Sequence, residues 1–283
     1  MVLDQLQSDV MKISGYLFLS AALLMMYSCN QSPKHPQANY IQQPAATAMT
    51  EESISLLADS IDVNISKFEK QTSLVFQSDN HAMYVERYSY NGKPVMYASY
   101  TDDISKGNVQ QRYYFQNDSL LLLREHKRSG NDADQRFTDT YTYLRNNIPF
   151  KIDSRTAGNE NELTRKGFHN IKPDPAVSEN KAPYQKSIQV FEDALQQKDQ
   201  FDMRFADYIA AGEESYIQLK SNAQNGYSAS VMVETPDALI DSLIKSPSSF
   251  KNEKIRFQWK VMDKEAIYVP VASRMTSASG LKR

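Results

Sequence analysis

Residues 84–100 read YVERYSYNGKPVMYASY, and this stretch decides the fold class. Strand-favouring tyrosine and valine residues stand on both sides of a central Asn91-Gly92 pair. Asn-Gly is the strongest short signal of a β-hairpin, because both residues tolerate the positive φ angles of a type I′ turn. The stretch therefore predicts two antiparallel strands, residues 84–90 and 95–100, joined by a tight turn.

The same pattern occurs twice more. Residues 112–125 and 140–152 each place strand-like runs around a turn pair, Asn117-Asp118 and Asn146-Asn147. Three successive hairpins predict an antiparallel β-meander. The expected strands contain eight tyrosines: Tyr84, Tyr88, Tyr90, Tyr97, Tyr100, Tyr113, Tyr141 and Tyr143. We expect most of them to pack within the sheet, where aromatic cross-strand pairs contribute ~0.2–1 kcal/mol each, and a minority to form an exposed binding face.

A helix is expected before the hairpins. Between residues 51 and 70, apolar side chains recur at steps of three and four: Ile54, Leu57, Ile61, Ile65 and Phe68. This spacing places them on one face of an amphipathic helix. Thr50 is the expected N-cap, and Glu51 and Glu52 complement the helix dipole in the first turn. We expect the apolar face to pack against the sheet.

The middle of the chain is expected to be irregular and then helical. Residues 158–186 are polar and contain Pro173, Pro175 and Pro183, which predicts a long loop. A second helix is predicted over 187–211, with Gly212 as its C-terminal stop.

The C-terminal part of the chain has the sequence pattern of several short strands. Strands are predicted over 216–220 and 227–234, and Thr235-Pro236-Asp237 opens a short helix. Residues 255–261 alternate apolar and polar side chains, and Asp263 and Lys264 form a turn into a last strand, 266–272. In this order the C-terminal segment resembles a small OB-like or other compact barrel, in architecture only. The predicted fold class is α+β: an antiparallel β-meander of hairpins with packed helices, followed by a small β-rich, OB-like unit.

Cys29 is the only cysteine, so it cannot form an internal disulfide. It follows the uncharged run 13–28, and Lys12 supplies positive charge before that run. The stretch Met26-Tyr27-Ser28-Cys29 resembles the relaxed lipobox of Bacteroidetes-type bacterial lipoproteins. The resemblance implies that the leader is cleaved and that Cys29 is lipidated. The alternative is an uncleaved anchor helix, but the uncharged run is shorter than the ~20 residues that span a bilayer.

These observations give an expected division of the chain. Asp4 and Asp9 do not suit an export signal, so residues 1–10 are interpreted as a start-site extension and Met11 as the start. The expected segments are a signal peptide (11–28), the lipidated cysteine with a disordered tether (29–50), a helix plus meander domain (51–157), the polar loop (158–186), a helix plus small β-rich unit (187–277) and a tail (278–283). Residues 30–34 contain no acidic side chain, and by resemblance this composition implies an outer-membrane lipoprotein that faces the periplasm.

Charge and motifs exclude several functions. A net charge of -2 and a pI near 6.1 do not favour nucleic acid as a partner. The four histidines have no zinc-ligand spacing, and the sequence lacks nucleotide-binding and hydrolase motifs, so we predict no metal, no cofactor and no catalytic residue. Three weaker candidates are interpreted as solvated side chains: the pair Asp102-Asp103, His126 at an exposed strand end, and Asp132 with Asp134 as an incomplete calcium loop.

Two classes of function remain. The first is a non-catalytic, lipid-anchored binding or structural module, held to the membrane through Cys29, with an envelope protein or a glycan as partner. The second is an envelope hydrolase whose active site is assembled from dispersed residues. A glycan platform built on Trp259 is disfavoured, because Trp259 alternates in phase with Ile255 and Phe257 and is expected in the core.

Overall fold

The computed structural model describes residues 49–103, 107–130, 134–173 and 182–271. All of them belong to one compact unit, residues 46–283. Cys29 and its lipobox, the signal peptide, most of the tether and the C-terminal tail lie outside the described residues. Among the helices that the structure describes, none combines the length and the apolar character of a membrane-spanning segment.

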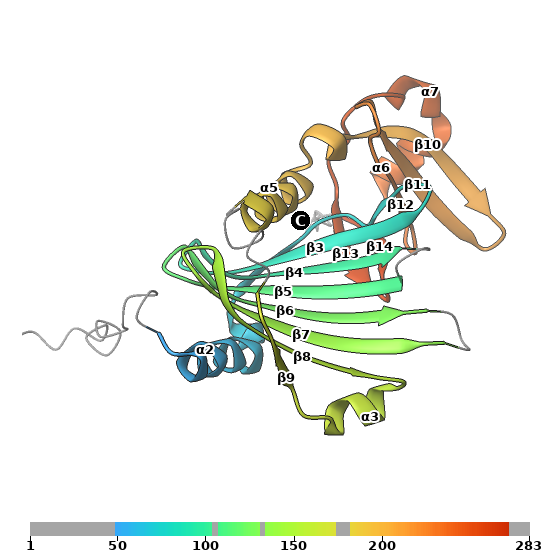
Figure 1. The fold of residues 1–283 in the computed structure, drawn as a ribbon. Helices are drawn as coiled ribbons and strands as arrows, with labels where there is room; N and C mark the ends of the chain where they lie inside the picture. Colours follow the sequence, from blue (N-terminus) through green and yellow to red (C-terminus); the bar gives the residue numbers. More distant parts are fainter. Residues whose placement is uncertain (1–48, 104–106, 131–133, 174–181, 272–283) are drawn as a thin grey trace, which may run out of the picture. The chain divides into compact units, whose positions relative to one another are not determined.

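Six long strands form the expected meander (Figure 1). They are β3 (His81–Tyr90), β4 (Lys93–Asp103), β5 (Gly107–Gln116), β6 (Ser119–Ser129), β7 (Arg136–Arg145) and β8 (Ile148–Ala157). Each strand pairs antiparallel with the next, so the three predicted hairpins are confirmed. Asn91 and Gly92 have φ angles of 51° and 74°, and the turn pairs of the other two hairpins also have positive φ. Asparagine, aspartate and glycine suit these turns because they adopt that conformation at low cost.

The three hairpins share one irregularity. In each hairpin, the two residue pairs next to the turn lie directly opposite each other without a register shift, and a β-bulge follows them. The second strand of each hairpin therefore carries one extra residue, which is Val95, Leu121 or Phe150. A bulge shifts every later pair by one residue and increases the local twist of the strands.

The sheet continues on both sides of the meander. β9 (His169–Ile171) lies beyond β8, and four strands lie beyond β3: β2 (Phe76–Gln77), β12 (Ser228–Met232), β11 (Glu214–Ser221) and β10 (Met203–Ala211). β1 (Glu69–Thr72) pairs with β3, and β13 (Gln258–Met262) pairs with β14 (Glu265–Val269), which runs parallel to β12. Strands from both halves of the chain thus share one sheet, and the α+β class with a large antiparallel sheet is confirmed.

Helices lie on both faces of this sheet (Figure 1). On one face, α2 (Glu51–Val63) buries Ile54, Ala58 and Ile61 against a cluster that includes Met96 and Tyr114. On the other face, α5 (Ala182–Gln196) packs on a second cluster, which contains Tyr97 and Tyr113. Adjacent strand residues point to opposite faces, so neighbouring tyrosines serve different cores. Of the eight tyrosines in the predicted strands, Tyr88, Tyr97, Tyr113 and Tyr143 are buried, and Tyr90 is exposed.

The first helix is shorter than predicted. Thr50 is its N-cap, since its hydroxyl accepts a hydrogen bond from Ser53 N at 3.2 Å, as expected. However, α2 ends at Val63 and is followed by a 3-10 turn, η3 (Ile65–Lys67), and by β1, so the prediction of a helix up to residue 70 is wrong at its C-terminal end.

The predicted helix 187–211 is wrong in its second part. α5 ends at Gln196, where Gln197 adopts a φ of 50°, and a 3-10 turn, η4 (Asp199–Phe201), leads into β10. Gly212, at φ 67°, belongs to the β10–β11 turn and does not end a helix. The segment expected as a loop also contains α3 (Glu160–Arg165) and β9.

The C-terminal elements follow the predicted order with shifted bounds. α6 (Ala238–Lys245) is capped by Asp237 itself, whose carboxylate accepts hydrogen bonds from two backbone N–H groups, and α7 (Pro247–Phe250) follows. The turn at Asp263 and Lys264 is confirmed, with φ angles of 50° and 68°. Trp259 is half-buried against the larger core cluster, and its Nε1 donates to Ser73 O at 3.1 Å.

Candidate functional site

Helix α2 covers only part of its face of the sheet. Near its C-terminal end, the Asp62 carboxylate lies 3.3 Å from Arg112 and 3.2 Å from Arg124, and the Arg124 guanidinium also lies 2.7 Å from Asp59. These ion pairs hold the helix over one row of residues that runs across the strands. The next row on the same face lies two residues further along each strand, because side chains alternate between faces.

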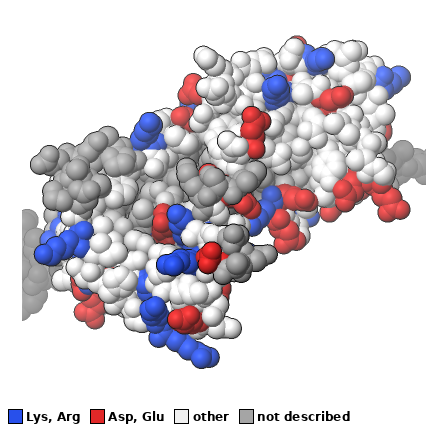
Figure 2. All heavy atoms as spheres, turned by 45° about the vertical axis from the view of Figure 1, so that its right-hand side comes forward, with Lys and Arg blue, Asp and Glu red and all other residues white. Residues whose placement is uncertain are grey.

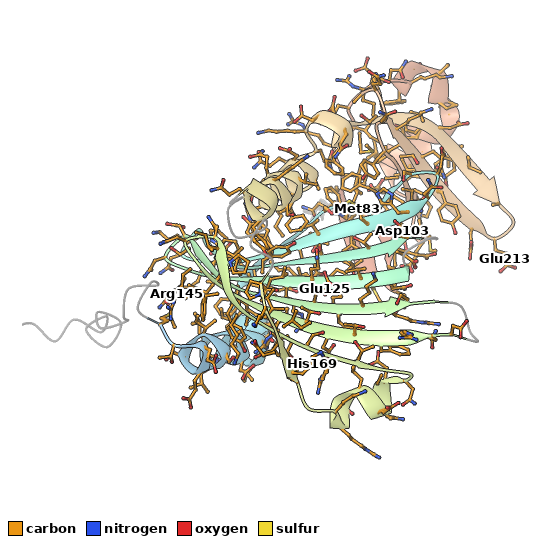
Figure 3. The ribbon with its side chains drawn as sticks, viewed as in Figure 1. Met83, Asp103, Glu125, Arg145, His169 and Glu213 are labelled. Atoms are coloured by element: carbon orange, nitrogen blue, oxygen red, sulfur yellow. The ribbon has the colours of Figure 1, made fainter. Side chains whose placement is uncertain are left out.

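This next row crosses six strands in continuous register, and we call it the transverse row. Its members are Tyr84, Tyr100, Gln110, His126, Asp139 and Arg155. It lies toward the end of the sheet where Met83 and Asp103 are found, which is the end opposite to Arg145 (Figure 3). The row therefore brings together side chains that are up to 71 positions apart in the sequence.

A groove of about 740 Å³ lies along this part of the sheet. Its size is within the ~300–1,000 Å³ typical of ligand sites. Its lining includes Tyr84, Tyr100, Gln110 and His126 of the transverse row, side chains from α3 and β2, and the β13–β14 turn. The groove is thus bounded by elements from both halves of the chain.

The aromatic part of the groove is a stacked pair. The Tyr84 and Tyr100 rings are parallel within 10°, with centroids 4.4 Å apart, and the two residues are direct cross-strand partners. Burial raises the pKa of both phenols, and each also feels nearby negative charge, including that of Glu86. Both rings are therefore neutral at physiological pH and present hydroxyl groups as donors and acceptors.

The polar centre of the groove is His126. Its Nδ1 lies 2.7 Å from Asp139 Oδ1 and its Nε2 lies 3.0 Å from Glu160 Oε1, with the side chain 37% exposed. Asp139 is buried and is held in addition by Arg155, 2.7 Å away. The interpretation of His126 as a solvated strand end is wrong, because the register of β6 and β7 places it directly opposite Asp139.

Glu160 reaches His126 because of how α3 is anchored. The Asn159 side chain caps this helix by accepting a hydrogen bond from Glu162 N at 2.9 Å. Leu163, which is fully buried, packs α3 on Phe137 and Ala157 at the end of the β7–β8 pair. This contact places the first residue of the helix, Glu160, over the transverse row.

Carboxamides and paired charges make up most of the remaining polar lining. The carboxamides of the groove are Gln77, Asn108, Gln110 and Gln135. Asp102 Oδ2 lies 3.4 Å from Asn108 Nδ2 and 3.7 Å from Lys264 Nζ. The Asp102 side chain is 53% exposed, which agrees with the expectation of a solvated carboxylate, and its distant partner Lys264 belongs to the β13–β14 turn.

A smaller pocket of about 270 Å³ adjoins the groove. The two share Val75, Gln77, Lys264 and Glu265 in their linings. The smaller pocket continues over β11 and β12, where Tyr216, Gln218, Ser230 and Met232 line it. The hollow surface therefore extends from the meander onto the C-terminal strands.

Charges on the described part of the surface are mixed in sign. On the face drawn in Figure 2, acidic and basic side chains lie among uncharged ones. The groove lining contains four carboxylates, from Asp102, Glu160, Asp263 and Glu265, against the cations Arg128 and Lys264. This balance disfavours an anionic ligand.

The other sequence candidates do not join this site. His169 is exposed on β9 (Figure 3) and is not among the residues that line the groove. His81 lies between Ser78 and the Tyr227 hydroxyl, at 2.9 Å from each. Asp132 lies outside the described residues. Among the residues that the structure describes, no group of three His, Cys, Asp or Glu side chains is arranged to hold a metal ion.

Comparison of the chain with protein-family models, with curated proteins and with solved structures gives no match.

Proposed function

We propose that this protein is a lipid-anchored envelope lipoprotein of the outer membrane, facing the periplasm, whose folded part is a non-catalytic binding module. The observation that carries the binding role is the groove over the transverse row. It combines a stacked aromatic pair, several carboxamides and a mixed set of paired charges in a concavity of about 740 Å³. A concavity of this size on which several polar groups converge is a common place for a protein to hold a small ligand.

The anchor rests on the sequence around Cys29. The positive Lys12, the uncharged run 13–28 and the lipobox-like Met26-Tyr27-Ser28-Cys29 support export and lipidation. Lipid chains on Cys29 would hold the protein at the membrane surface, because each buried CH₂ contributes ~0.8 kcal/mol. The polar tether would then separate the groove from the lipid headgroups.

We further propose that the C-terminal strands form an OB-like unit. Support comes from five strands, β10 to β14, with α6 between the third and the fourth, and from the hydrogen bonds that join Phe205 of β10 to Asn252 and Glu253. OB-folds bind ligands on the face of their second and third strands and at the loop between the fourth and fifth. The corresponding elements here are β11, β12 and the β13–β14 turn, which line the smaller pocket.

The anchor is tested by labelling cells with an alkyne analogue of palmitate. We expect the wild-type chain to carry the label and to sediment with membranes, and the Cys29→Ala variant to lose both properties. A Cys29→Ala variant that still sediments would favour an anchor helix, and an unlabelled wild-type chain in the soluble fraction would remove the anchor from the proposal.

The binding role is tested by photo-crosslinking in intact envelopes. Gln110, in the groove, is replaced by p-benzoylphenylalanine, and Ser242, exposed on α6 and absent from the groove lining, receives the same group as a control. We expect a discrete crosslinked product from position 110 and none from position 242. Equal products, or none from either position, would contradict the assignment of the groove as the binding site.

A second candidate, an envelope hydrolase, is favoured by one observation. His126 lies in the groove between Asp139 and Glu160, and a carboxylate-oriented imidazole is a common general base. Both carboxylates accept a hydrogen bond at once only when both ring nitrogens carry a proton, so a base role requires release from Glu160. Cleavage of an envelope peptide or oligosaccharide by the full chain, lost in His126→Gln, would establish this function.

A further inference from the structure

We infer that the groove binds a neutral oligosaccharide. This inference rests on the proposed function, because it names the ligand class of the same site. It is carried by three observations: the chemistry of the groove lining, the pairing of its charges and the orientation of the groove relative to the strands.

The lining suits a ligand that has hydroxyl groups on an apolar ring. A sugar hydroxyl both donates and accepts hydrogen bonds, and so does a carboxamide such as Gln110, which lies beside the Tyr100 hydroxyl. The C–H groups of a sugar ring pack against aromatic side chains such as Tyr84 and Tyr100. A wholly apolar ligand would bury these carboxamides and hydroxyls without partners, at a cost of about 1–3 kcal/mol each.

The charges in the groove disfavour a charged ligand. The carboxylates on the sheet and on α3 have partners: Asp139 pairs with Arg155 and His126, and Glu160 pairs with His126, while the exposed Asp102 lies 3.7 Å from the exposed Lys264. The remaining acidic side chains of the β13–β14 turn, Asp263 and Glu265, are exposed at the rim, where solvent screens them. An anionic ligand would be repelled by the excess of carboxylates in the groove lining. A cationic ligand would have to compete with Arg155 and His126 for carboxylates that these side chains already pair with. A neutral ligand incurs neither cost.

The orientation of the groove disfavours a peptide. Peptides commonly add as a strand to a free sheet edge or insert an apolar helix face into an apolar groove. Here the groove lies on a face of the sheet, over strands whose backbone groups are bonded to neighbouring strands. The four members of the transverse row that line the groove cross four adjacent strands, which is a path of about 14 Å at ~4.8 Å between neighbouring strands.

The inference is tested by isothermal titration calorimetry on the full chain. The neutral probes are the hexasaccharides of cellulose, starch and chitin, and the charged probes are the glucosamine hexamer and the galacturonate hexamer. We expect at least one neutral hexasaccharide to bind, and both charged probes to bind at least tenfold more weakly than it does. Binding of a charged probe as tightly as the best neutral one, or no binding of any probe, would overturn the inference.

Matched variants place the binding in the groove. Tyr100→Ala is expected to weaken binding of the neutral hexasaccharide at least tenfold. Tyr90→Ala removes a tyrosine that is 51% exposed at the other end of the hairpin, outside the groove lining, and is expected to bind as the wild type does. Circular dichroism checks that the variants are folded, and Gln110→Ala replaces Tyr100→Ala if the latter is not. A folded groove variant with wild-type affinity would contradict the inference.

The crosslinking at position 110 separates this inference from the proposed function. If no hexasaccharide binds but position 110 captures a specific envelope component, the groove is a binding site and the glycan assignment fails alone. If hexasaccharides do not bind and position 110 captures nothing, both fail.

Discussion

His126 Nδ1 lies 2.7 Å from Asp139 Oδ1, and the two residues face each other directly across the β6–β7 pair. Asp139 is in turn the cross-strand partner of Arg155 on β8, whose guanidinium lies 2.7 Å away. One buried carboxylate therefore ties three adjacent strands together beside the groove, which His126 lines. The free energy of this arrangement depends on the charge of Asp139, because breaking a buried pair leaves an uncompensated charge.

We predict that Asp139→Asn lowers the free energy of unfolding by about 3 kcal/mol, because Arg155 then keeps a largely buried positive charge without its carboxylate. Urea denaturation followed by circular dichroism measures the change. The control is Asp118→Asn, which removes the partner of Lys93 in a pair that is exposed on both sides and 3.4 Å long. Exposed pairs contribute at most about 1 kcal/mol, so similar losses in the two variants would contradict the prediction.

We predict that Gly107→Ala destabilises the sheet by at least about 2 kcal/mol. Gly107 has a φ of 79°, and a Cβ there would lie 2.0 Å from the backbone oxygen of Arg128, which cannot move without breaking the β5–β6 ladder. Gly167→Ala is the matched control, because nothing lies within 4 Å of its Cβ position. Thermal unfolding of the two variants compares them, and a Gly107→Ala variant as stable as Gly167→Ala would show that the strand end relaxes freely.

We predict that the contact between α5 and the sheet weakens in acid. Burial raises the pKa of the Glu192 carboxyl, but hydrogen bonds from Tyr97, Gln196 and Arg87 outweigh it and hold the pKa below its ordinary value of 4.5. A carboxyl with a lowered pKa in the folded state contributes stability above its unfolded pKa, and this contribution is lost as the pH falls through the folded pKa.

The measurement is the difference in unfolding free energy between the wild type and Glu192→Gln. This difference should shrink as the pH falls from about 6 to about 3, because the variant lacks the titrating group. A difference that stays constant over this range would show that the pairing of Glu192 with Arg87 and Tyr97 does not contribute to stability.

We predict that the two halves of the described chain unfold together. Trp259, the only tryptophan, lies in the C-terminal half and donates a hydrogen bond to Ser73, which precedes the meander. β2 also joins β12 to β3 within one sheet. Denaturation followed by tryptophan fluorescence and by far-ultraviolet circular dichroism should therefore give coincident transitions. Separate transitions would support the division of the folded part into domains over 51–157 and 187–277.

The meander could be predicted from sequence because its signals are local. A turn pair such as Asn91-Gly92 specifies a hairpin through backbone preferences alone. The predicted helix 187–211 is too long for an equally physical reason: Phe201, Phe205 and Ile209 are spaced by four. Residues four apart share a face both in a helix and in a strand, so this spacing does not distinguish the two. The buried Met203, two residues from Phe205, shows that the strand period applies.

The candidate site could not be predicted in the same way, because it depends on register. A two-residue turn at Asn91-Gly92 with no bulge would pair Tyr84 with Ser99 and put Tyr100 on the opposite face. The bulge at Val95 shifts the register so that Tyr84 meets Tyr100. The turn pairs are visible in the sequence, but nothing beside them indicates the bulge that sets the register. Glu160 could not be assigned to the site for a different reason: it belongs to α3, which lies in a segment whose polar composition predicts a loop.

The edge strands of the sheet determine how readily two copies of the protein could associate through β-strand pairing. Two of the edge strands are β9, of only three residues, and β10, which is bulged between Phe205 and Asp207 and whose Phe205 is hydrogen-bonded to Asn252 and Glu253. β1 and β13 are further edge strands, of four and five residues. Short, kinked or covered edges are poor templates for another chain to add to. Such edges reduce the tendency of neighbouring copies to join strand to strand into fibrils.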